Sequence, residues 1–280
     1  MAEPKMITRP IPSTGEAMPV VGLGTWPVFD VGTDDAARQP LREVVKALVA
    51  GGGKMIDTSP MYGRSEGVVG DIVAELGMRK EVFLATKVWI SGRERGIEQM
   101  ARSAQLLKSP VIDLMQVHNL VDWRTQLATM REMKAKGQLR YIGITHYTTG
   151  ALAELARILD GESGIDFVQL GYSLATREPE TTVLPVAARR GVAVIVNQPF
   201  EQGNLFRKVR GKPLPDWAAE FDGASWGQVF LKYLLGDPAV TVVIPATNKP
   251  DHMADNLKAG YGRLPDPQQR DGIRRYWESL

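Results

Sequence analysis

The sequence contains no cysteine, and its only three histidines are scattered at positions 118, 146 and 252. Without cysteine there can be no disulfides, no thiolate catalysis and no zinc site built on cysteine ligands. Histidines without paired spacing are a poor ligand set for a metal. We therefore predict no metal site, and a metal hydrolase is the weakest of the functions considered.

Long apolar runs and an excess of charge of one sign are also missing. No stretch approaches the roughly 18 apolar residues that a membrane-spanning helix needs, and residues 1–6 contain no apolar region typical of a signal peptide. The formal net charge is only +2, so no overall field favours nucleic acid or a membrane surface as partner. We expect a cytoplasmic monomer that binds neither.

Apolar runs suited to strands alternate with amphipathic segments along most of the chain. After a β-hairpin of residues 7–12 and 17–20, strands are predicted at 20–25, 54–57, 82–87, 112–117, 139–144, 166–170, 192–196 and 241–245. Helices are predicted at 41–50, 66–76, 94–107, 123–136, 149–159, 181–190, 225–235 and 250–259, with an extra one at 267–280. The strands lack polar/apolar alternation, as parallel strands covered on both faces do.

Eight strand–helix units predict an α/β fold of one domain, residues 1–280: a (β/α)8 TIM barrel with an N-terminal β-hairpin and a C-terminal extra helix. A doubly wound sheet is the alternative. It would normally carry G-x-G-x-x-G after a strand. The nearest match, residues 22–27 (G-L-G-T-W-P), lacks the third glycine, and the barrel is favoured.

The segment from Lys54 to Glu66 reads K-M-I-D-T-S-P-M-Y-G-R-S-E. A short buried strand is expected to end at Asp57, and a loop with proline and glycine then presents Tyr62. Ser65 is expected to cap the helix that follows. A structural interpretation stays open here, in which Asp57 caps a neighbouring backbone and Tyr62 packs its ring.

Polar or ionisable residues follow nearly every predicted strand. In a (β/α)8 barrel these positions meet at one mouth, where active sites lie. They are Thr25, Trp26, Asp57, Lys87, His118, Asn119, Thr145, His146, Gln169, Asn197, Gln198, Ala246, Thr247 and Asn248. A purely structural mouth would not need aspartate, lysine and histidine together, so a catalytic site is predicted.

Three of these side chains, Asp57, Lys87 and His118, are suited to general acid catalysis together with Tyr62 of the neighbouring loop. An ammonium at Lys87 is expected to lower the pKa of a nearby Tyr62 hydroxyl below its usual value of about 10. Asp57 would keep Lys87 charged, and His118 would orient a carbonyl group or relay a proton. None of them is an obvious nucleophile or hydride source, so we expect a cofactor to supply the hydride.

The chain resembles the aldo-keto reductase family. The resemblance is carried by M-I-D-T-S-P-M-Y-G-R-S-E at 55–66, F-L-A-T-K-V-W at 83–89, D-L-M-Q-V-H at 113–118, Y-I-G-I-T at 141–145, V-Q-L-G-Y-S at 168–173 and I-P-A-T-N-K-P-D-H-M-A-D-N at 244–256. It implies a (β/α)8 barrel that reduces aldehydes and ketones to alcohols with NADP(H), less often with NAD(H).

The resemblance also implies the role of individual residues. Asp57, Tyr62, Lys87 and His118 match the catalytic tetrad, with Tyr62 as the acid in reduction. The implied cofactor contacts are Gly24, Thr25, Trp26, Asp57, Thr145, His146, Gln169, Asn197, Gln198, Phe200, Thr247, Asn248, Lys249, His252 and Asn256. Substrate contacts are expected at Trp26, Tyr62, Trp89 and His118, and Met61 could add to the same apolar pocket.

Several positions depart from the family's pattern. His146 replaces a common asparagine, and Asn197 replaces the aromatic ring that stacks on the nicotinamide. Ala246 and His252 stand where NADP-specific members often carry lysine and arginine, so two charge-assisted contacts of about 1.5–3 kcal/mol each are lost. NADP(H) remains the expected cofactor, with NAD(H) open.

Two other functions remain as alternatives, and the role of one cationic segment is also open. Lys87 could form a Schiff base with a carbonyl substrate, or the chain could be a non-catalytic subunit that senses a bound cofactor. The segment Phe206–Lys212 holds four cations and no acid. It could fold over the pyrophosphate of a cofactor, although a solvated surface loop is favoured.

Overall fold

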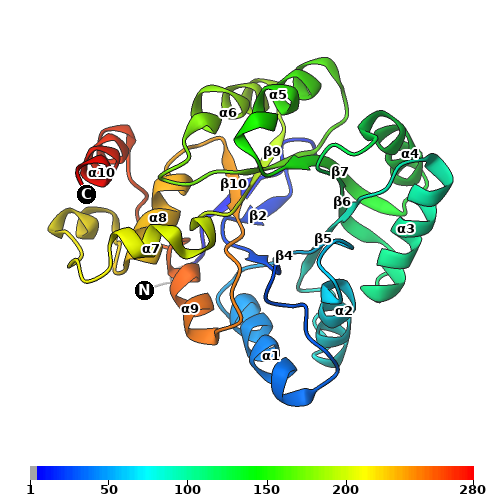
Figure 1. Cartoon of the computed structure of the whole chain (residues 1–280), viewed down its shortest axis with the longest axis horizontal. Helices are drawn as coiled ribbons and strands as arrows, with labels where there is room; N and C mark the ends of the chain where they lie inside the picture. The colour runs from blue at the N-terminus through cyan, green and yellow to red at the C-terminus, as the bar shows by residue number, and fades with distance from the viewer. Residues whose placement is uncertain (1–4) are drawn as a thin grey trace.

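The computed structural model describes residues 5–280, so residues 1–4 of the predicted domain lie outside it. Eight parallel strands form one sheet in the order β10-β9-β8-β7-β6-β5-β4-β3, surrounded by helices (Figure 1). Bridges between Val21 and Val243 and between Gly24 and Ala246 join the first strand to the last. The sheet thus closes on itself, and the predicted (β/α)8 barrel is confirmed.

The strands are short and lie close to their predicted positions. They are β3 (Leu23–Gly24), β4 (Met55–Asp57), β5 (Phe83–Val88), β6 (Ile112–His118), β7 (Leu139–His146), β8 (Phe167–Gly171), β9 (Ala193–Asn197) and β10 (Val240–Val243). A separate antiparallel hairpin pairs β1 (Thr8–Pro10) with β2 (Ala17–Pro19).

Helices α1 to α8 lie between successive barrel strands, and α9 and α10 follow the last strand. They are α1 (Asp35–Ala50), α2 (Ser65–Glu75), α3 (Arg93–Leu106), α4 (Trp123–Ala135), α5 (Leu152–Gly161), α6 (Val183–Arg190), α7 (Asn204–Lys208), α8 (Trp226–Leu235), α9 (Pro250–Lys258) and α10 (Pro267–Ser279). Short 3-10 turns lie at η1 (Thr149–Ala151), η2 (Glu178–Thr181), η3 (Glu201–Gly203) and η4 (Asp216–Phe221). None of the described helices is long and apolar enough to cross a bilayer.

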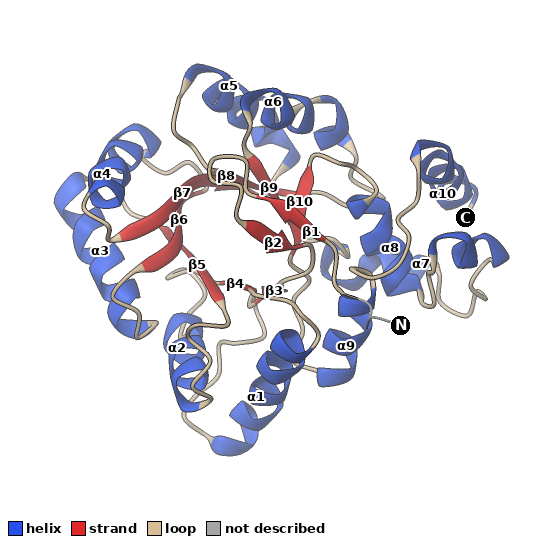
Figure 2. Cartoon of the chain, turned by 180° about the vertical axis from the view of Figure 1, so that it is seen from behind, coloured by secondary structure: helices blue, strands red, loops and turns tan. Residues whose placement is uncertain are grey.

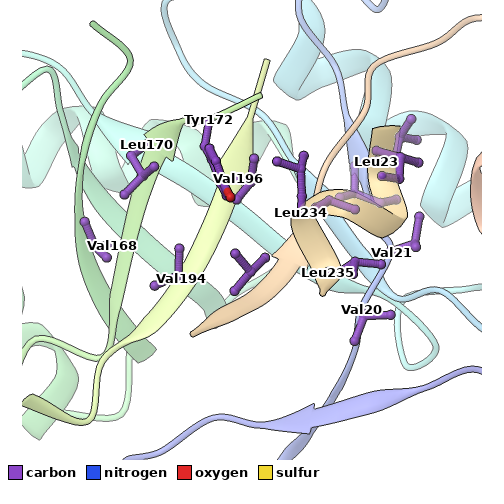
Figure 3. Close-up of a cluster of buried hydrophobic side chains, with 14 of the residues drawn as sticks. Val20, Val21, Leu23, Val168, Leu170, Tyr172, Val194, Val196, Leu234 and Leu235 are labelled. Atoms are coloured by element: carbon purple, nitrogen blue, oxygen red, sulfur yellow. The ribbon is translucent and has the colours of Figure 1, made fainter. Parts of the chain in front are cut away.

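Two apolar layers flank the sheet, because alternate side chains of a strand point to opposite faces. On β9, Val194 and Val196 pack outward against the helices, while Ala193 and Ile195 point into the barrel. Figure 3 shows part of the outer layer, where strand residues meet Leu234 and Leu235 of α8. Both faces are buried, which explains why the strand sequences show no polar/apolar alternation.

The hairpin closes the N-terminal end of the barrel, as the reverse view shows (Figure 2). Ile11 and Met18 are buried in the inner layer, and the Thr14 hydroxyl lies 2.8 Å from the hydroxyl of Tyr141. This end of the barrel interior is therefore filled with side chains.

The C-terminal helix α10 lies outside the ring of helices, beside α7 and α8 (Figure 1). Arg270 attaches it to the barrel by donating to the Tyr172 hydroxyl at 2.8 Å and to Glu180 at 2.9 Å. The predicted hairpin and extra helix are therefore both confirmed.

Three local predictions were wrong. Ser65 does not cap α2: it lies inside the helix, where its hydroxyl accepts a hydrogen bond from Thr58 at 3.0 Å. The first helix begins at Asp35, not at residue 41, because Asp34 caps it by accepting from the Ala37 amide at 3.0 Å. Residues 204–208 form α7, although this part of the chain was predicted to be a loop.

Candidate functional site

A cavity of about 980 Å³ opens at the C-terminal ends of the barrel strands. Fourteen of the predicted site residues line it: Gly24, Thr25, Trp26, Asp57, Tyr62, His118, Thr145, Gln169, Asn197, Gln198, Phe200, Thr247, His252 and Asn256. Its volume is at the upper end of the range usual for small-molecule and cofactor sites. The polar residues at the strand ends thus converge, as predicted.

The strand pleat explains why these side chains meet. Phe83 and Ala85 of β5 belong to the inner layer, so Lys87 continues the inward-facing series. Leu114, two residues before Gln116 on β6, is inward-facing in the same way, and His118 follows at the strand's end. The layer of inward-facing side chains at the C-terminal ends of the strands is therefore polar, whereas the layers nearer the N-terminal ends are apolar.

Lys87 and Asp57 form a buried ion pair. The Lys87 ammonium donates to Asp57 Oδ2 at 2.7 Å and to the carbonyl oxygen of Thr58 at 2.8 Å, and its side chain is 0% exposed. The other carboxylate oxygen, Oδ1, accepts from Gln169 at 2.7 Å and from Gln116 at 3.2 Å. Both charged groups are held by several hydrogen bonds, which is the condition for keeping a charge pair inside a protein.

Tyr62 lies directly beside this pair. Lys87 Nζ is 5.0 Å from the centre of its ring, and the His118 ring packs edge-on against it with centroids 5.8 Å apart. Burial raises the pKa of the Tyr62 hydroxyl above its usual value, and the nearby Lys87 only partly offsets this. The expectation of a lowered pKa was wrong, because burial outweighs the charge of Lys87 and Asp57 opposes that charge as well.

Lys87 keeps its proton. Burial by itself lowers the pKa of the ammonium, but the charge of Asp57 and the hydrogen bond to it, together with the neighbouring Tyr62 hydroxyl, outweigh burial and the pKa is raised. A lysine that is charged, paired and inaccessible cannot attack a carbonyl carbon. The geometry therefore does not favour the Schiff-base alternative.

His118 is neutral and held in one orientation. Burial, with a smaller effect of Lys87, lowers its pKa to about 3. Its Nδ1 lies 3.0 Å from the Ser59 hydroxyl, whose oxygen also accepts from the Met61 amide at 3.1 Å. Ser59 is fully buried, so its own proton needs an acceptor, and Nδ1 is the partner within reach. This leaves Nε2 as the N–H group of His118.

A group of amides forms the floor of the cavity beside Asp57. Gln169 Oε1 accepts from Asn197 Nδ2 at 3.1 Å and lies 3.5 Å from the Thr145 hydroxyl. The oxygens Asn197 Oδ1 and Asn119 Oδ1 are both buried, and neither has a hydrogen-bond partner among residues 5–280. Two unpartnered acceptors at the cavity wall fit a ligand that brings N–H donors, such as the carboxamide of a nicotinamide.

The far end of the cavity lies at the start of α8. The Ser225 hydroxyl caps this helix by accepting from the Gln228 amide at 3.1 Å, and it donates to Asp255 at 2.6 Å. Trp226, Gly227 and His252 complete this wall. Sequence reasoning missed Ser225, Trp226 and Asp255. A helix was predicted to begin at residue 225, and in a (β/α)8 barrel the first turn of such a helix lies at the C-terminal ends of the strands. That prediction could have placed its first residues at the cavity.

Five predicted residues lie off the cavity wall: Lys87, Trp89, His146, Asn248 and Lys249. Lys87 lies behind Tyr62, and the Trp89 ring is 6.3 Å from that of His118. His146 stacks on Tyr147, which lines the wall in its place. The implied cofactor contacts of His146, Asn248 and Lys249 stay predictions.

No lysine or arginine lines the cavity among the residues that the structure describes. In the cationic segment Phe206–Lys212 only Phe206 reaches the wall, while Lys208 donates to the Trp277 carbonyl at 2.8 Å. The idea that this segment covers a pyrophosphate with its charges is not supported. Residues 5–280 also contain no group of three or more His, Asp or Glu side chains that could hold a metal ion.

Known proteins are similar to this chain in sequence and in fold. The chain is 30% identical over 217 residues to the aldo-keto reductase YhdN of Bacillus subtilis, covering 71% of this chain and 63% of that protein. It is 27% identical over 230 residues to the NADH-specific methylglyoxal reductase of Escherichia coli, covering 70% and 68%. The solved aldo-keto reductase of Klebsiella pneumoniae in complex with NADPH superimposes with a TM-score of 0.81 at 23% identity, covering 99% and 96%.

The model of the Aldo/keto reductase family matches residues 20–271, which include every barrel strand and every residue of the candidate site. This chain therefore belongs to the aldo-keto reductase family.

Proposed function

We propose that the protein reduces the carbonyl group of an aldehyde or ketone to an alcohol, with NADPH as hydride donor and Tyr62 as general acid. The observation that carries this proposal is the buried Lys87–Asp57 pair, joined at 2.7 Å directly beside Tyr62 at the wall of the cavity. A bound reduced nicotinamide would supply the hydride, which protein side chains do not provide.

Tyr62 is suited to give a proton at neutral pH. Because burial raises the pKa of its hydroxyl, the group is protonated before the reaction. When the proton leaves, the adjacent Lys87 ammonium stabilises the phenolate that forms. Asp57 is fixed by Gln169 and Gln116 and holds Lys87 in place, so little rearrangement is needed.

His118 would help to place the substrate. A neutral imidazole with its proton on Nε2 can donate to a carbonyl oxygen but does not compete with Tyr62 as the acid. The Tyr62 hydroxyl and the His118 N–H would then hold the same oxygen from two sides. Two donors at a developing negative charge stabilise the transition state more than the ground state.

The cofactor would be held by the cavity's amide floor and its far end. Thr145, Gln169 and Asn197 are proposed to bind the nicotinamide carboxamide, because Asn197 brings an unpartnered acceptor. NAD(H) is a second candidate, since no cation of the described residues lines the wall where a 2′-phosphate would need one. Proposed contacts for the rest of the dinucleotide are Gly24, Thr25, Gln198, Phe200, Thr247, His252 and Asn256.

The direct test is replacement of Tyr62 by phenylalanine. We expect a loss of about 10²–10⁴-fold in kcat/KM, because the general acid is removed, while the KM for NADPH and the thermal unfolding curve stay close to those of the natural chain. The assay is the loss of NADPH absorbance with a panel of aldehydes and ketones. Full activity in Tyr62→Phe would rule out this acid.

The Ser59–His118 contact gives a second prediction. In Ser59→Ala, Nδ1 loses its donor, the imidazole can adopt either tautomer, and kcat/KM should fall by about tenfold. Nitrogen NMR of labelled His118 would show the tautomer mixture directly.

Ser65→Ala is the matched control for this prediction. Ser65 is a buried serine of the same segment, but its hydroxyl contacts Thr58 and not His118. Its loss should leave the His118 tautomer and kcat/KM close to those of the natural chain. Equal losses of activity in the two variants would contradict a specific role for Ser59.

A further inference from the structure

The proposed acid, Tyr62, is carried by a loop and not by a strand of the barrel. Residues 58–64 form this loop, which connects β4 to α2. Its first residue is anchored to the barrel, because the Lys87 ammonium donates to the Thr58 carbonyl oxygen at 2.8 Å. Loops are more mobile than the strands and helices that they connect. The position of the Tyr62 hydroxyl therefore depends on what holds the rest of the loop.

Asp30 holds the far end of this loop from the segment between β3 and α1. Its carboxylate oxygen Oδ1 accepts a hydrogen bond from the Arg64 backbone amide at 3.0 Å. The same carboxylate lies against Gly63, where an added Cβ atom would be only 2.4 Å from Asp30 Cγ. Gly63 has a φ of +61° and no side chain, so it lets the carboxylate approach the backbone beside Tyr62.

The segment that carries Asp30 is itself fixed, and part of it lines the cavity. At its start the Thr25 hydroxyl donates to the Asp57 carbonyl oxygen at 2.9 Å, and further along it Phe29 is fully buried. Residues 26–28 belong to the cavity wall, but Asp30 does not. The same short segment thus joins the cavity wall to the loop that carries the acid.

We propose that Asp30 is a positioning residue for proton transfer, which fixes the Tyr62 hydroxyl relative to the carbonyl group that is reduced. It acts through the Arg64 amide and not by touching the reacting atoms. A substrate in contact with residues 26–28 would restrict the motion of this segment, so that its binding favours the reactive arrangement of Tyr62. A misplacement of about 1 Å can reduce a rate by about 100-fold. This inference rests on the proposed function and adds a residue to it.

Two substitutions of Asp30 test the proposal in single turnovers, followed by stopped-flow absorbance of NADPH with the carbonyl compound of the panel that the natural chain reduces fastest. In Asp30→Ala the Arg64 amide loses its acceptor, and the rate constant of hydride transfer should fall by about tenfold. Asp30→Asn keeps an acceptor oxygen and should retain most of the rate. The rate constant, unlike the amplitude, does not depend on the fraction of folded protein, so a loss of stability alone would not change it.

Asp34→Ala is the matched control from the same segment. The Asp34 carboxylate also accepts from one backbone amide, that of Ala37 at 3.0 Å, but this contact caps α1 and does not involve the loop of Tyr62. The urea midpoint of unfolding should fall in this variant, while the single-turnover rate constant stays close to that of the natural chain.

Gly63→Ala approaches the same contact from the other side. Its methyl group would collide with the Asp30 carboxylate, so the loop must shift and the rate constant should fall. In the double variant with Asp30→Ala this collision is absent. The two losses should therefore not multiply, as expected for residues in direct contact.

Three results would overturn the positioning role while leaving carbonyl reduction intact. They are an unchanged rate constant in Asp30→Ala, equal losses in Asp30→Ala and Asp34→Ala, and an Asp30→Asn variant as slow as Asp30→Ala. If the natural chain oxidises neither NADPH nor NADH with any carbonyl compound of the panel, the proposed function is wrong, and the role of Asp30 in proton transfer is wrong with it.

Discussion

Replacing Lys87 with methionine should abolish measurable carbonyl reduction and lower the free energy of unfolding by about 3–5 kcal/mol. The substitution leaves the Asp57 carboxylate buried with only Gln169 and Gln116 to hold it, and a buried charge without its partner is strongly unfavourable. Denaturant unfolding and NADPH oxidation measure the two effects separately.

A double variant separates charge from packing. Asp57→Asn combined with Lys87→Met removes both charges, so much of the stability should return while activity stays absent. If Lys87→Met alone were as stable as the natural chain, the buried ion pair would not be the arrangement described.

Gly70→Ala should destabilise the fold by about 2–4 kcal/mol. A Cβ atom at this position would lie 2.0 Å from the carbonyl oxygen of Leu106 and 2.8 Å from the Cα atom of Leu107. Both are backbone atoms at the end of α3, so α2 and α3 would have to move apart. The measurement is the free energy of unfolding in urea.

Gly67→Ala is the matched control on the same helix. Its Cβ would meet only the Leu106 side chain, at the ordinary contact distance of 3.7 Å. Because alanine is a better helix former than glycine, this variant should be more stable by about 0.5–1 kcal/mol. The same sign for both variants would show that the helices do not approach as closely as described.

The barrel and the position of the candidate site could be predicted from the sequence because both depend on local signals. Apolar runs locate the strands, and the polar residue after each run locates the mouth, as Asp57 and His118 illustrate. Gln116 was missed because it lies inside a strand, where only the inward alternation would have revealed it.

Properties that depend on several distant groups could not be predicted in this way. The pKa of Tyr62 depends on the balance between burial and two opposite charges, and the sequence shows the charges but not the burial. Ser65 has the residue type of a helix cap, but Thr58 already donates to its hydroxyl. The far wall joins Ser225 to Asp255, 30 residues further along the chain, by a contact that no periodicity signals.

The closure of the barrel has a consequence for whatever binds in the cavity. The segments around β3 and β10 meet through two isolated bridges, whereas β6 and β7, for example, pair along most of their length. Gly24 and Ala246, which form one of these bridges, also line the cavity. A bound molecule that contacted both residues would bridge the junction of the first and last strands, and its binding energy would oppose their separation. Binding of such a molecule would then stabilise the closed barrel.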